Sequence, residues 1–347
     1  MRYVAIAAAI FSATITQTSS PNATLTAVPG IKVGHHTLTE RPTGCTAILI
    51  EAGATAGVDV RGSAPASAET DLLKPTNLVQ QIHAIALAGS SAFGLDARSG
   101  VVTYLDEKNI GFKVYNGTAN VPIVPASALI DLNVGGNPKI RVNADCGYRA
   151  ARAATTDPVA EGNVGAGAGA TVGKFGGTGN RAMKAGVGSA AIRMNDGLIV
   201  AALVAVNAAG DIIDPDTNRV IAGVRTADGK SLADSRKLLK SGAQVQAAVG
   251  ENTTLGVVAT NATLTKPQAT KVAEMAHDGF ARAIYPSHTM GDGDTIYAVA
   301  TGGKSGDANV SQIGALAAQV MAEAIVRAAT QATGIPGYPA ARDIGRQ

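Results

Sequence analysis

The chain has 347 residues, of which 46% are hydrophobic and 16% are charged, and its net charge is +3. This composition supports one large or two ordinary globular domains with a sizeable core. The small, scattered charge argues against a nucleic-acid partner, and 3% aromatic residues without Trp argue against a platform for stacked bases. The 41 glycines, beside many aliphatic residues, predict tight turns rather than disorder.

Residues 1–20 have the pattern of an export signal. Arg2 gives a positive start, and residues 3–15 form an apolar segment too short to span a bilayer. The alternative is a frayed N-terminal helix. We therefore expect a periplasmic or secreted protein, or a cytoplasmic one if this segment is no signal, and we expect no membrane partner. Cys45 and Cys146 could pair in an oxidising compartment, but their spacing does not decide it.

The first half of the chain predicts strands followed by helices. Strands and turns are expected over residues 26–60, and helical spacing of apolar residues predicts a helix over 77–87. A second helix is expected over 93–107 and another over 145–155. Two prolines make residues 121–130 an edge segment at best.

A polar cluster lies within a segment rich in Gly, Ala and Ser. The cluster predicts either an internal salt-bridged loop or a pocket wall that holds a substrate amine or carboxylate, and its members are Asp59, Arg61, Glu69 and Asp71. Ser91 lies in Gly-Ser-Ser-Ala-Phe-Gly, which is not a nucleophile elbow, because Phe93 stands where the second glycine belongs.

The glycine-rich segment 162–179 imitates a nucleotide-binding loop. Ala170 replaces the third glycine of a dinucleotide fingerprint, and Phe175 replaces the Ser or Thr of a phosphate loop. What remains is Lys174, flanked by apolar residues. A desolvated lysine loses its charge readily and shifts the proton affinity of neighbouring groups.

The second half predicts an apolar strand over 199–206 that ends in Asn207. An Asn there is usually a turn residue, but its amide can also donate to an oxyanion. The remaining expected elements are a basic helix over 231–241, an exposed loop over 242–250, a buried strand over 255–259, a helix over 266–284 capped by Thr265, a strand over 296–300 and a helix over 310–329.

Thr253 begins the buried strand and follows Asn252. Threonine is a common strand residue, so this position is compatible with a purely structural role. If the Asn252–Thr253 bond were cut, however, Thr253 would carry both a hydroxyl nucleophile and a free α-amine. Such an amine titrates near about 7.7–8 and can act as the base for its own hydroxyl.

A second block, residues 285–295, contains Asp292-Gly293-Asp294. Together with Asn252-Thr253-Thr254, it resembles the L-aminopeptidase/D-esterase (DmpA-like) family of self-cleaving peptidases, which includes the nylon-oligomer hydrolases. The resemblance extends from about residue 30 to about residue 328. It also includes Gly30-Ile31-Lys32-Val33-Gly34-His35, Asp59-Val60-Arg61-Gly62, Gly89-Ser90-Ser91-Ala92-Phe93-Gly94-Leu95 and Gly169-Ala170-Thr171-Val172-Gly173-Lys174.

The resemblance implies an α/β fold, the four-layer αββα sandwich of the N-terminal-nucleophile hydrolases. It implies a single domain processed into a large chain, residues 26–252, and a small chain, residues 253–347, in a homo-oligomer of such heterodimers. It implies no cofactor. It gives roles to five residues: nucleophile Thr253, oxyanion donor Asn207, active-site lysine Lys174, and Asp292 and Asp294, which orient the amine and hydroxyl.

The same resemblance places the turn containing Ser91 and Phe93 at the active-site pocket. A metal site at His288, Asp292 and Asp294 is not expected, because no Cys or other His stands at ligand spacing beside the two aspartates.

The implied activity is an amidohydrolase or aminopeptidase acting on short peptides, with β- or D-amino acyl groups as candidates. Asn-Thr and Asp-Gly-Asp bring the sequence closer to the nylon-oligomer hydrolases, so an endo-type hydrolase of amide oligomers is an alternative. The two remaining alternatives are an acyltransferase of the ornithine-acetyltransferase type and a non-catalytic binding module.

Overall fold

The computed structural model describes residues 22–175, 181–242 and 252–344. Within these ranges, nine strands are linked in the order β10-β11-β14-β16-β2-β4-β7-β3, with β1 paired to β2. Their bounds are β1 (Lys32–Thr37), β2 (Gly44–Val60), β3 (Ser67–Ala68), β4 (Ile82–Ala88), β7 (Ala126–Ala128), β10 (Val187–Arg193), β11 (Ile199–Asn207), β14 (Thr253–Thr260) and β16 (Thr295–Ala300).

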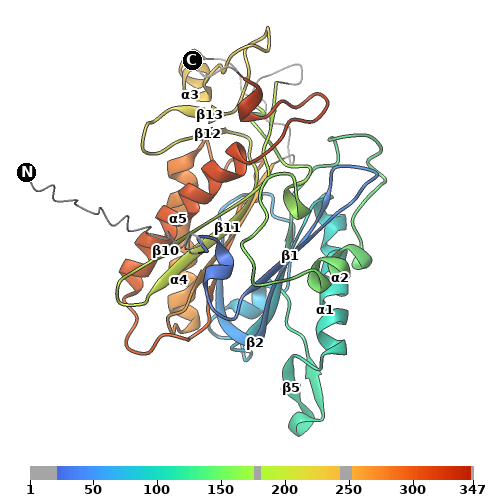
Figure 1. The fold of residues 1–347 in the computed structure, drawn as a ribbon, viewed down its shortest axis with the longest axis vertical. Coiled ribbons are helices and arrows are strands. Elements are labelled where there is room, and N and C mark those ends of the chain that lie inside the picture. Colours follow the sequence, from blue (N-terminus) through green and yellow to red (C-terminus); the bar gives the residue numbers. More distant parts are fainter. Residues whose placement is uncertain (1–21, 176–180, 243–251, 345–347) are drawn as a thin grey trace, which may run out of the picture.

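The long strand β2 joins two sheets. Its first part, residues 44–49, pairs with β1 and β4, whereas residues 55–60 pair with β16. Helices α1 (Ala97–Glu107) and α2 (Ala144–Arg152) lie against the sheet of β1 and β4. Helices α4 (Lys266–Ala283) and α5 (Val310–Thr330) lie against the sheet of β10, β11, β14 and β16 (Figure 1).

Strand β11 shows how alternation builds the layers. Val200, Ala202 and Val204 belong to the core shared with α4 and α5. Ile199, Ala201 and Leu203 belong to the core between the two sheets. Because successive side chains of a strand point to opposite faces, a strand that is apolar throughout serves two cores at once. A third core lies beneath α1 and α2. The predicted αββα arrangement is therefore confirmed.

Residues 77–87 form no helix, contrary to the prediction, and Ile82–Ala88 is strand β4. All seven of its residues are buried. A short, mostly apolar run occurs both in buried strands and in buried helices. Its spacing alone therefore could not distinguish the two. The helix predicted from residue 93 is also shorter at its start, because a 3-10 turn, η3 (Ser91–Asp96), precedes α1.

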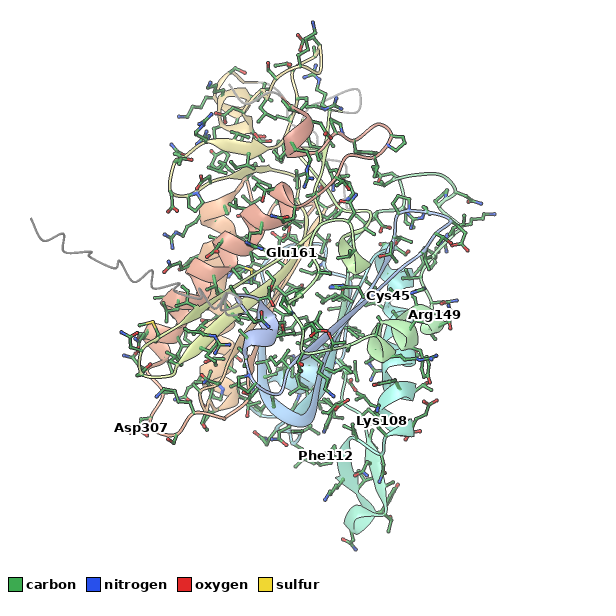
Figure 2. The ribbon with its side chains drawn as sticks, viewed as in Figure 1. Cys45, Lys108, Phe112, Arg149, Glu161 and Asp307 are labelled. Atoms are coloured by element: carbon green, nitrogen blue, oxygen red, sulfur yellow. A yellow bond between two sulfur atoms is a disulfide. The ribbon has the colours of Figure 1, made fainter. Side chains whose placement is uncertain are left out.

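The remaining elements are small. β5 (Phe112–Val114) and β6 (Ala119–Val121) form a hairpin that projects beyond the end of α1, where Figure 2 labels Lys108 and Phe112. The others are β8 (Thr171–Val172), β9 (Met183–Lys184), β12 (Asp211–Ile213), β13 (Val220–Ala222), β15 (Ile284–Tyr285) and α3 (Ser235–Lys240).

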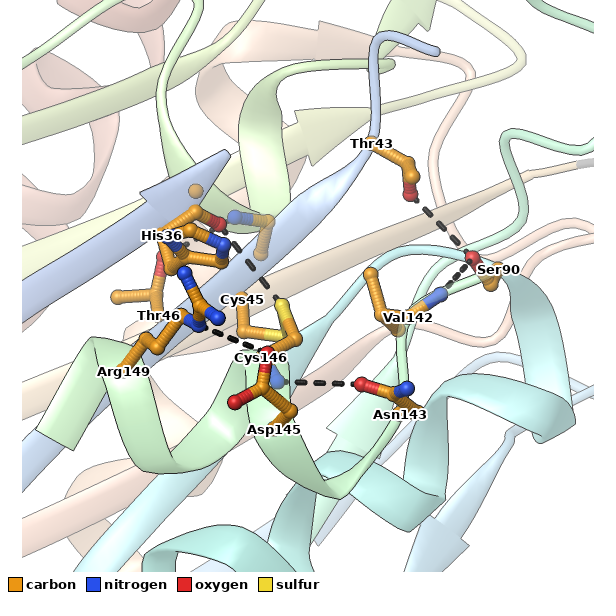
Figure 3. The surroundings of a disulfide bond; sticks show 12 residues. His36, Thr43, Cys45, Thr46, Ser90, Val142, Asn143, Asp145, Cys146 and Arg149 are labelled. Carbon is orange, nitrogen blue, oxygen red and sulfur yellow. Dashed lines mark hydrogen bonds and ion pairs between the residues drawn. A yellow bond between two sulfur atoms is a disulfide. The ribbon is translucent and has the colours of Figure 1, made fainter. Parts of the chain in front are cut away.

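Cys45 and Cys146 form a disulfide that ties β2 to α2 across 101 residues of sequence (Figure 3). The first turn of α2 is capped by Asn143, whose side chain accepts a hydrogen bond from the Cys146 N–H at 3.2 Å. The pairing that spacing left open is thus present in the folded chain.

Helix α5 is long and apolar enough to cross a membrane by length and composition, and 61% of that apolar window is buried inside the protein. It packs on α4, β10 and β11. The predicted export signal, residues 1–20, lies outside the described residues, as does most of the predicted loop 242–250.

Candidate active site

Three separate predicted segments meet at one end of the sheet. Asn207, the last residue of β11, lies directly opposite Thr253, the first residue of β14. Strand β16 runs parallel to β14 and begins at Thr295, immediately after the two predicted aspartates. The Asn207 and Thr253 side chains are buried. The pairing of the strands therefore brings the hydroxyl residue, the amide and the aspartates together.

The carbonyl of Asn252 receives two hydrogen bonds. The Thr253 hydroxyl donates to this carbonyl oxygen, and so does the backbone N–H of Gly293, at 3.1 Å. The hydroxyl therefore lies against the peptide bond that precedes its own residue. The Gly293 N–H is already directed at the oxygen that would become negative if that carbonyl were attacked.

Asp294 anchors the start of β14. Its Oδ1 accepts the Thr254 N–H at 2.8 Å. Its Oδ2 accepts the N–H of His288 at 3.0 Å and lies 2.8 Å from the His288 Nδ1. A buried carboxylate with three donors is well compensated for its lost solvation. Asp294 thus fixes the backbone one residue after Thr253.

Asp292 differs from Asp294 in being only half satisfied. Its Oδ2 accepts from the Thr289 N–H at 2.9 Å and the Thr289 hydroxyl at 2.6 Å. Its Oδ1 is buried and has no hydrogen-bond partner among the described residues. Burial raises the pKa of Asp292, the neighbouring charge of Asp294 raises it further, and Thr289 and the charge of Lys174 oppose the rise. This carboxyl is consequently a better base than an exposed one.

The turn between the two aspartates has no room for a side chain. A Cβ on Gly293 would lie 2.6 Å from the Ala64 carbonyl oxygen and 2.7 Å from the Thr253 Oγ1. The segment after β2 also holds this turn by backbone bonds, because the Arg61 N–H donates to the Asp294 carbonyl at 3.0 Å and the Ala64 N–H to the Asp292 carbonyl at 2.8 Å. Glycine therefore allows the Thr253 hydroxyl to approach.

Lys174 is held by Asn207. Its Nζ lies 2.8 Å from the Asn207 Oδ1, which also accepts the Thr171 N–H at 3.0 Å. The Asn207 Nδ2 donates to the Ile130 carbonyl at 2.8 Å. In the uncut chain, then, the Asn207 amide orients the lysine, while the Asn252 carbonyl takes other donors. Donation by Asn207 to the oxyanion of a bound substrate stays a prediction.

Three of the predicted substrate residues form salt bridges. Arg61 pairs with Asp59 at 2.7 Å and donates to the Glu274 carbonyl at 3.0 Å. Glu69 pairs with Arg98 at 2.7 Å. These contacts correspond to the salt-bridged alternative, and contact of Asp59, Arg61 or Glu69 with substrate stays a prediction.

The other two predicted substrate residues, Ser91 and Phe93, lie on the η3 turn. The Ser91 N–H donates to the Leu129 carbonyl at 2.8 Å. The Phe93 ring is exposed, and the guanidinium carbon of Arg141 lies 3.5 Å from its centroid. The loop that follows Leu129 carries Ile130, whose carbonyl binds Asn207, so the turn and the site share one loop. A role of Ser91 or Phe93 in binding substrate stays a prediction.

Sequence reasoning missed two contributors. His288 binds Asp294, and the Gly293 N–H binds the Asn252 carbonyl. A glycine between two aspartates was a usable signal for the second, because it marks a close backbone approach. Within the described ranges there is no group of three or more His, Cys, Asp or Glu side chains that could hold a metal ion.

The comparisons with known proteins agree with this geometry. The family model of peptidase family S58 matches residues 23–342. The chain belongs to peptidase family S58. It is accordingly a hydrolase of peptide bonds. An uncharacterized aminopeptidase of Mycobacterium tuberculosis (strain H37Rv) is 37% identical over 346 residues, covering 92% of this S58 chain and 97% of that protein.

A second relative of this S58 chain bears a different name. The 6-aminohexanoate-oligomer endohydrolase of Paenarthrobacter ureafaciens is 30% identical over 314 residues, covering 86% of this chain and 84% of that protein. The resemblance to the family with nylon-oligomer hydrolases is thus confirmed.

Two solved structures share the fold. A β-aminopeptidase of Burkholderia sp. superposes with a TM-score of 0.66 at 24% identity, over 91% of this S58 chain and 88% of the other. The L-aminopeptidase D-Ala-esterase/amidase of Ochrobactrum anthropi is described as a variant of the Ntn hydrolase fold. It superposes with a TM-score of 0.66 at 19% identity, over 94% of this chain and 91% of the other.

Proposed function

We propose that this S58 chain is a self-cleaving N-terminal-threonine amidohydrolase. It cuts itself between Asn252 and Thr253 and then hydrolyses short peptides or related amides through an acyl-enzyme on Thr253. The observation that carries the proposal is the convergence of the Thr253 hydroxyl and the Gly293 N–H on the Asn252 carbonyl oxygen.

In the cleavage step, the Thr253 Oγ attacks the Asn252 carbonyl carbon and gives up its proton, for which Asp292 is the proposed acceptor. The Gly293 N–H stabilises the oxyanion of the tetrahedral intermediate. The carbon–nitrogen bond then breaks, the amine of Thr253 takes a proton, and an ester links Asn252 to Oγ. Water hydrolyses this ester, which releases the Asn252 carboxylate and restores the hydroxyl.

The packing around Asn252 favours its departure after cleavage. Its side chain is buried, and neither Oδ1 nor Nδ2 has a hydrogen-bond partner among the described residues. A buried unsatisfied amide costs about 1–3 kcal/mol. The Thr254 N–H stays bound to Asp294, so the new chain start remains in the sheet while the Asn252 end leaves and opens the site.

In the mature enzyme, Thr253 attacks the amide carbonyl of a substrate. The α-amine of Thr253, or Lys174, takes the hydroxyl proton and returns one to the leaving amine. Asn207, which holds Lys174 at 2.8 Å, is the proposed donor to the substrate oxyanion. Water then hydrolyses the acyl-enzyme.

Export is part of the proposal. The disulfide between Cys45 and Cys146 supports it, because such bonds persist in oxidising compartments and are rare in the cytosol of mesophiles.

Substrate assays test the proposal. Purified protein is incubated with aminoacyl anilides and with linear 6-aminohexanoate oligomers. Release of the aromatic amine supports the aminopeptidase, whereas shortening of oligomers without anilide hydrolysis supports the endo-type alternative, which is favoured by the 30% identity to an endohydrolase. Failure of both substrate classes with a processed protein would contradict the proposed activity.

A further inference from the structure

The Asp294 carboxylate connects the start of β14 to His288. It has three hydrogen-bond donors, of which His288 supplies two. The backbone N–H and the ring Nδ1 of His288 both contact the Oδ2 of Asp294, at 3.0 and 2.8 Å. The backbone of His288 is left-handed, with φ of +57°. This conformation brings the N–H and the ring to the same oxygen.

The His288 ring is held by helix α4. The His277 ring lies edge-on to it at 4.8 Å between centroids, and the Phe280 ring is stacked at 5.8 Å. Residues three apart lie on one face of a helix, so α4 presents both rings to His288 together. Only 20% of the His288 side chain is exposed. The imidazole therefore has one orientation, with Nδ1 toward the carboxylate.

His277 continues the series of contacts away from the site. Its side chain is fully buried, and its Nε2 lies 3.1 Å from the Asp59 carbonyl oxygen and 3.7 Å from the Asp59 carboxylate. Because a carbonyl can only accept, Nε2 carries the proton. Burial lowers the pKa of His277 to about 4, the bond to Asp59 opposes this, and the charge of His288 adds to it. His277 is neutral at neutral pH.

We propose that His288 is a positioning residue of the active site, which acts by holding the Asp294 carboxylate and, through it, the Thr253–Thr254 backbone, and that His277 acts in turn through His288. The inference rests on the proposed function. Neither histidine touches the Asn252 carbonyl in the contacts described above, so both act at a distance. The reacting groups of the cleavage step still belong to Asn252 and Thr253, and the donor to the oxyanion is still Gly293.

The bond geometry makes a sharp test available. An Asn side chain can place its amide N–H where the Nδ1 of His288 lies, and Asn tolerates a left-handed backbone. A Gln side chain carries the same amide one carbon farther, near the position of Nε2. Asn and Gln therefore differ in reach but not in chemistry, and neither titrates.

The experiment measures anilide hydrolysis and the rate of self-cleavage for His288→Asn, His288→Gln and His288→Ala, with thermal unfolding of each. We expect Gln and Ala to lower kcat roughly tenfold to a hundredfold, with KM within about twofold, because a misplaced reacting group loses rate rather than binding. We expect Asn to stay within about threefold of the natural protein. Wild-type kcat in the Gln variant, or equal losses in Asn and Gln, would overturn the inference.

If the Ala variant does not fold, the Asn and Gln pair decides the question. His83→Asn is the matched control, because His83 is a buried histidine on β4 whose Nδ1 contacts the Ile123 N–H at 3.3 Å. If the natural protein cleaves itself and hydrolyses substrate, and His288→Gln does both at the same rates, this inference is refuted while the proposed function stands. Absence of any chain beginning at Thr253 would refute the proposed function instead.

A double-mutant cycle tests the second half of the proposal. His277→Ala should lower kcat in the natural background and have little further effect in the His288→Ala background, since it acts through the same carboxylate. Full additivity of the two losses in kcat would show that His277 does not act through His288.

Discussion

Asn207 and Thr253 lie directly opposite each other at the ends of β11 and β14, so the amide that holds Lys174 faces the residue that carries the hydroxyl. This relationship is set by strand register. A shift of one residue would turn Thr253 to the other face of the sheet. The positions of the proposed catalytic groups therefore depend on the packing of both cores of the sheet.

Replacing Thr253 tests the nucleophile. Thr253→Ala should abolish self-cleavage and lower hydrolysis by roughly a thousandfold or more, whereas Thr253→Ser should retain part of both, because it keeps the hydroxyl. Thr260→Ala, at the other end of the same buried strand, is the control and should cleave normally. Cleavage is measured by mass spectrometry of the intact protein. Two chains from Thr253→Ala would show that Thr253 is not the nucleophile.

Gly293→Ala should slow self-cleavage by roughly a hundredfold or more, because its Cβ would displace the Thr253 hydroxyl or the Ala64 carbonyl and move the N–H from the Asn252 oxygen. Gly303→Ala serves as control, since a Cβ there meets nothing within 4 Å. A time course of the two fragments on a denaturing gel measures the rate. Equal rates for the two alanine variants would argue against the Gly293 donor.

Lys174→Met should lower kcat by roughly a hundredfold with little change in stability, because it removes the ammonium and keeps the length of the side chain. Asn207→Ala should lower kcat and also cost about 2–3 kcal/mol in unfolding free energy, because its bonds to Thr171 and Ile130 are lost as well. Lys271→Met on the exposed face of α4 is the control. Retained kcat in Lys174→Met would remove the lysine from the mechanism.

Stability should depend on pH through His277. Its folded pKa of about 4 lies below the ordinary value of 6.5, so the unfolded chain takes up the proton first. The uncut protein is therefore expected to lose stability as pH falls from about 6.5 to about 4. His277→Gln keeps an N–H for the Asp59 carbonyl but cannot titrate.

The measurement is urea unfolding across this range, in a Thr253→Ala background that stays uncut. The Gln variant should lose less stability than its parent on acidification. His35, whose pKa is also lowered to about 4 by desolvation, remains and preserves part of the slope. If the unfolding free energies of the variant and its parent fall equally with pH, His277 does not contribute to the pH dependence.

Replacing both Cys45 and Cys146 by Ala should lower the unfolding free energy by about 4 kcal/mol, because the bond closes a loop across 101 residues. Self-cleavage should persist, since neither cysteine contacts Thr253. Denaturant unfolding with and without a reductant measures the effect. A natural protein that is unaffected by reduction would show that the bond is absent in solution.

Much of the fold could be predicted from the sequence. β11 and β14 are short apolar runs with β-branched residues, and α4 has helical periodicity and a capping Thr265. β4 could not, because its seven buried residues, apolar except for His83, also fit the spacing of a buried helix. For the site, Thr253 and the aspartates were found by motif. The bond from His288 to Asp294, and the support of His288 by α4, depend on tertiary packing between residues without a shared local pattern.

The central claim is tested most directly by N-terminal sequencing of the purified protein. The account predicts two chains in equal amounts, one of which begins Thr-Thr-Leu-Gly at Thr253. A single intact chain that still hydrolyses amides, or a second chain that begins at a residue other than Thr253, would contradict it.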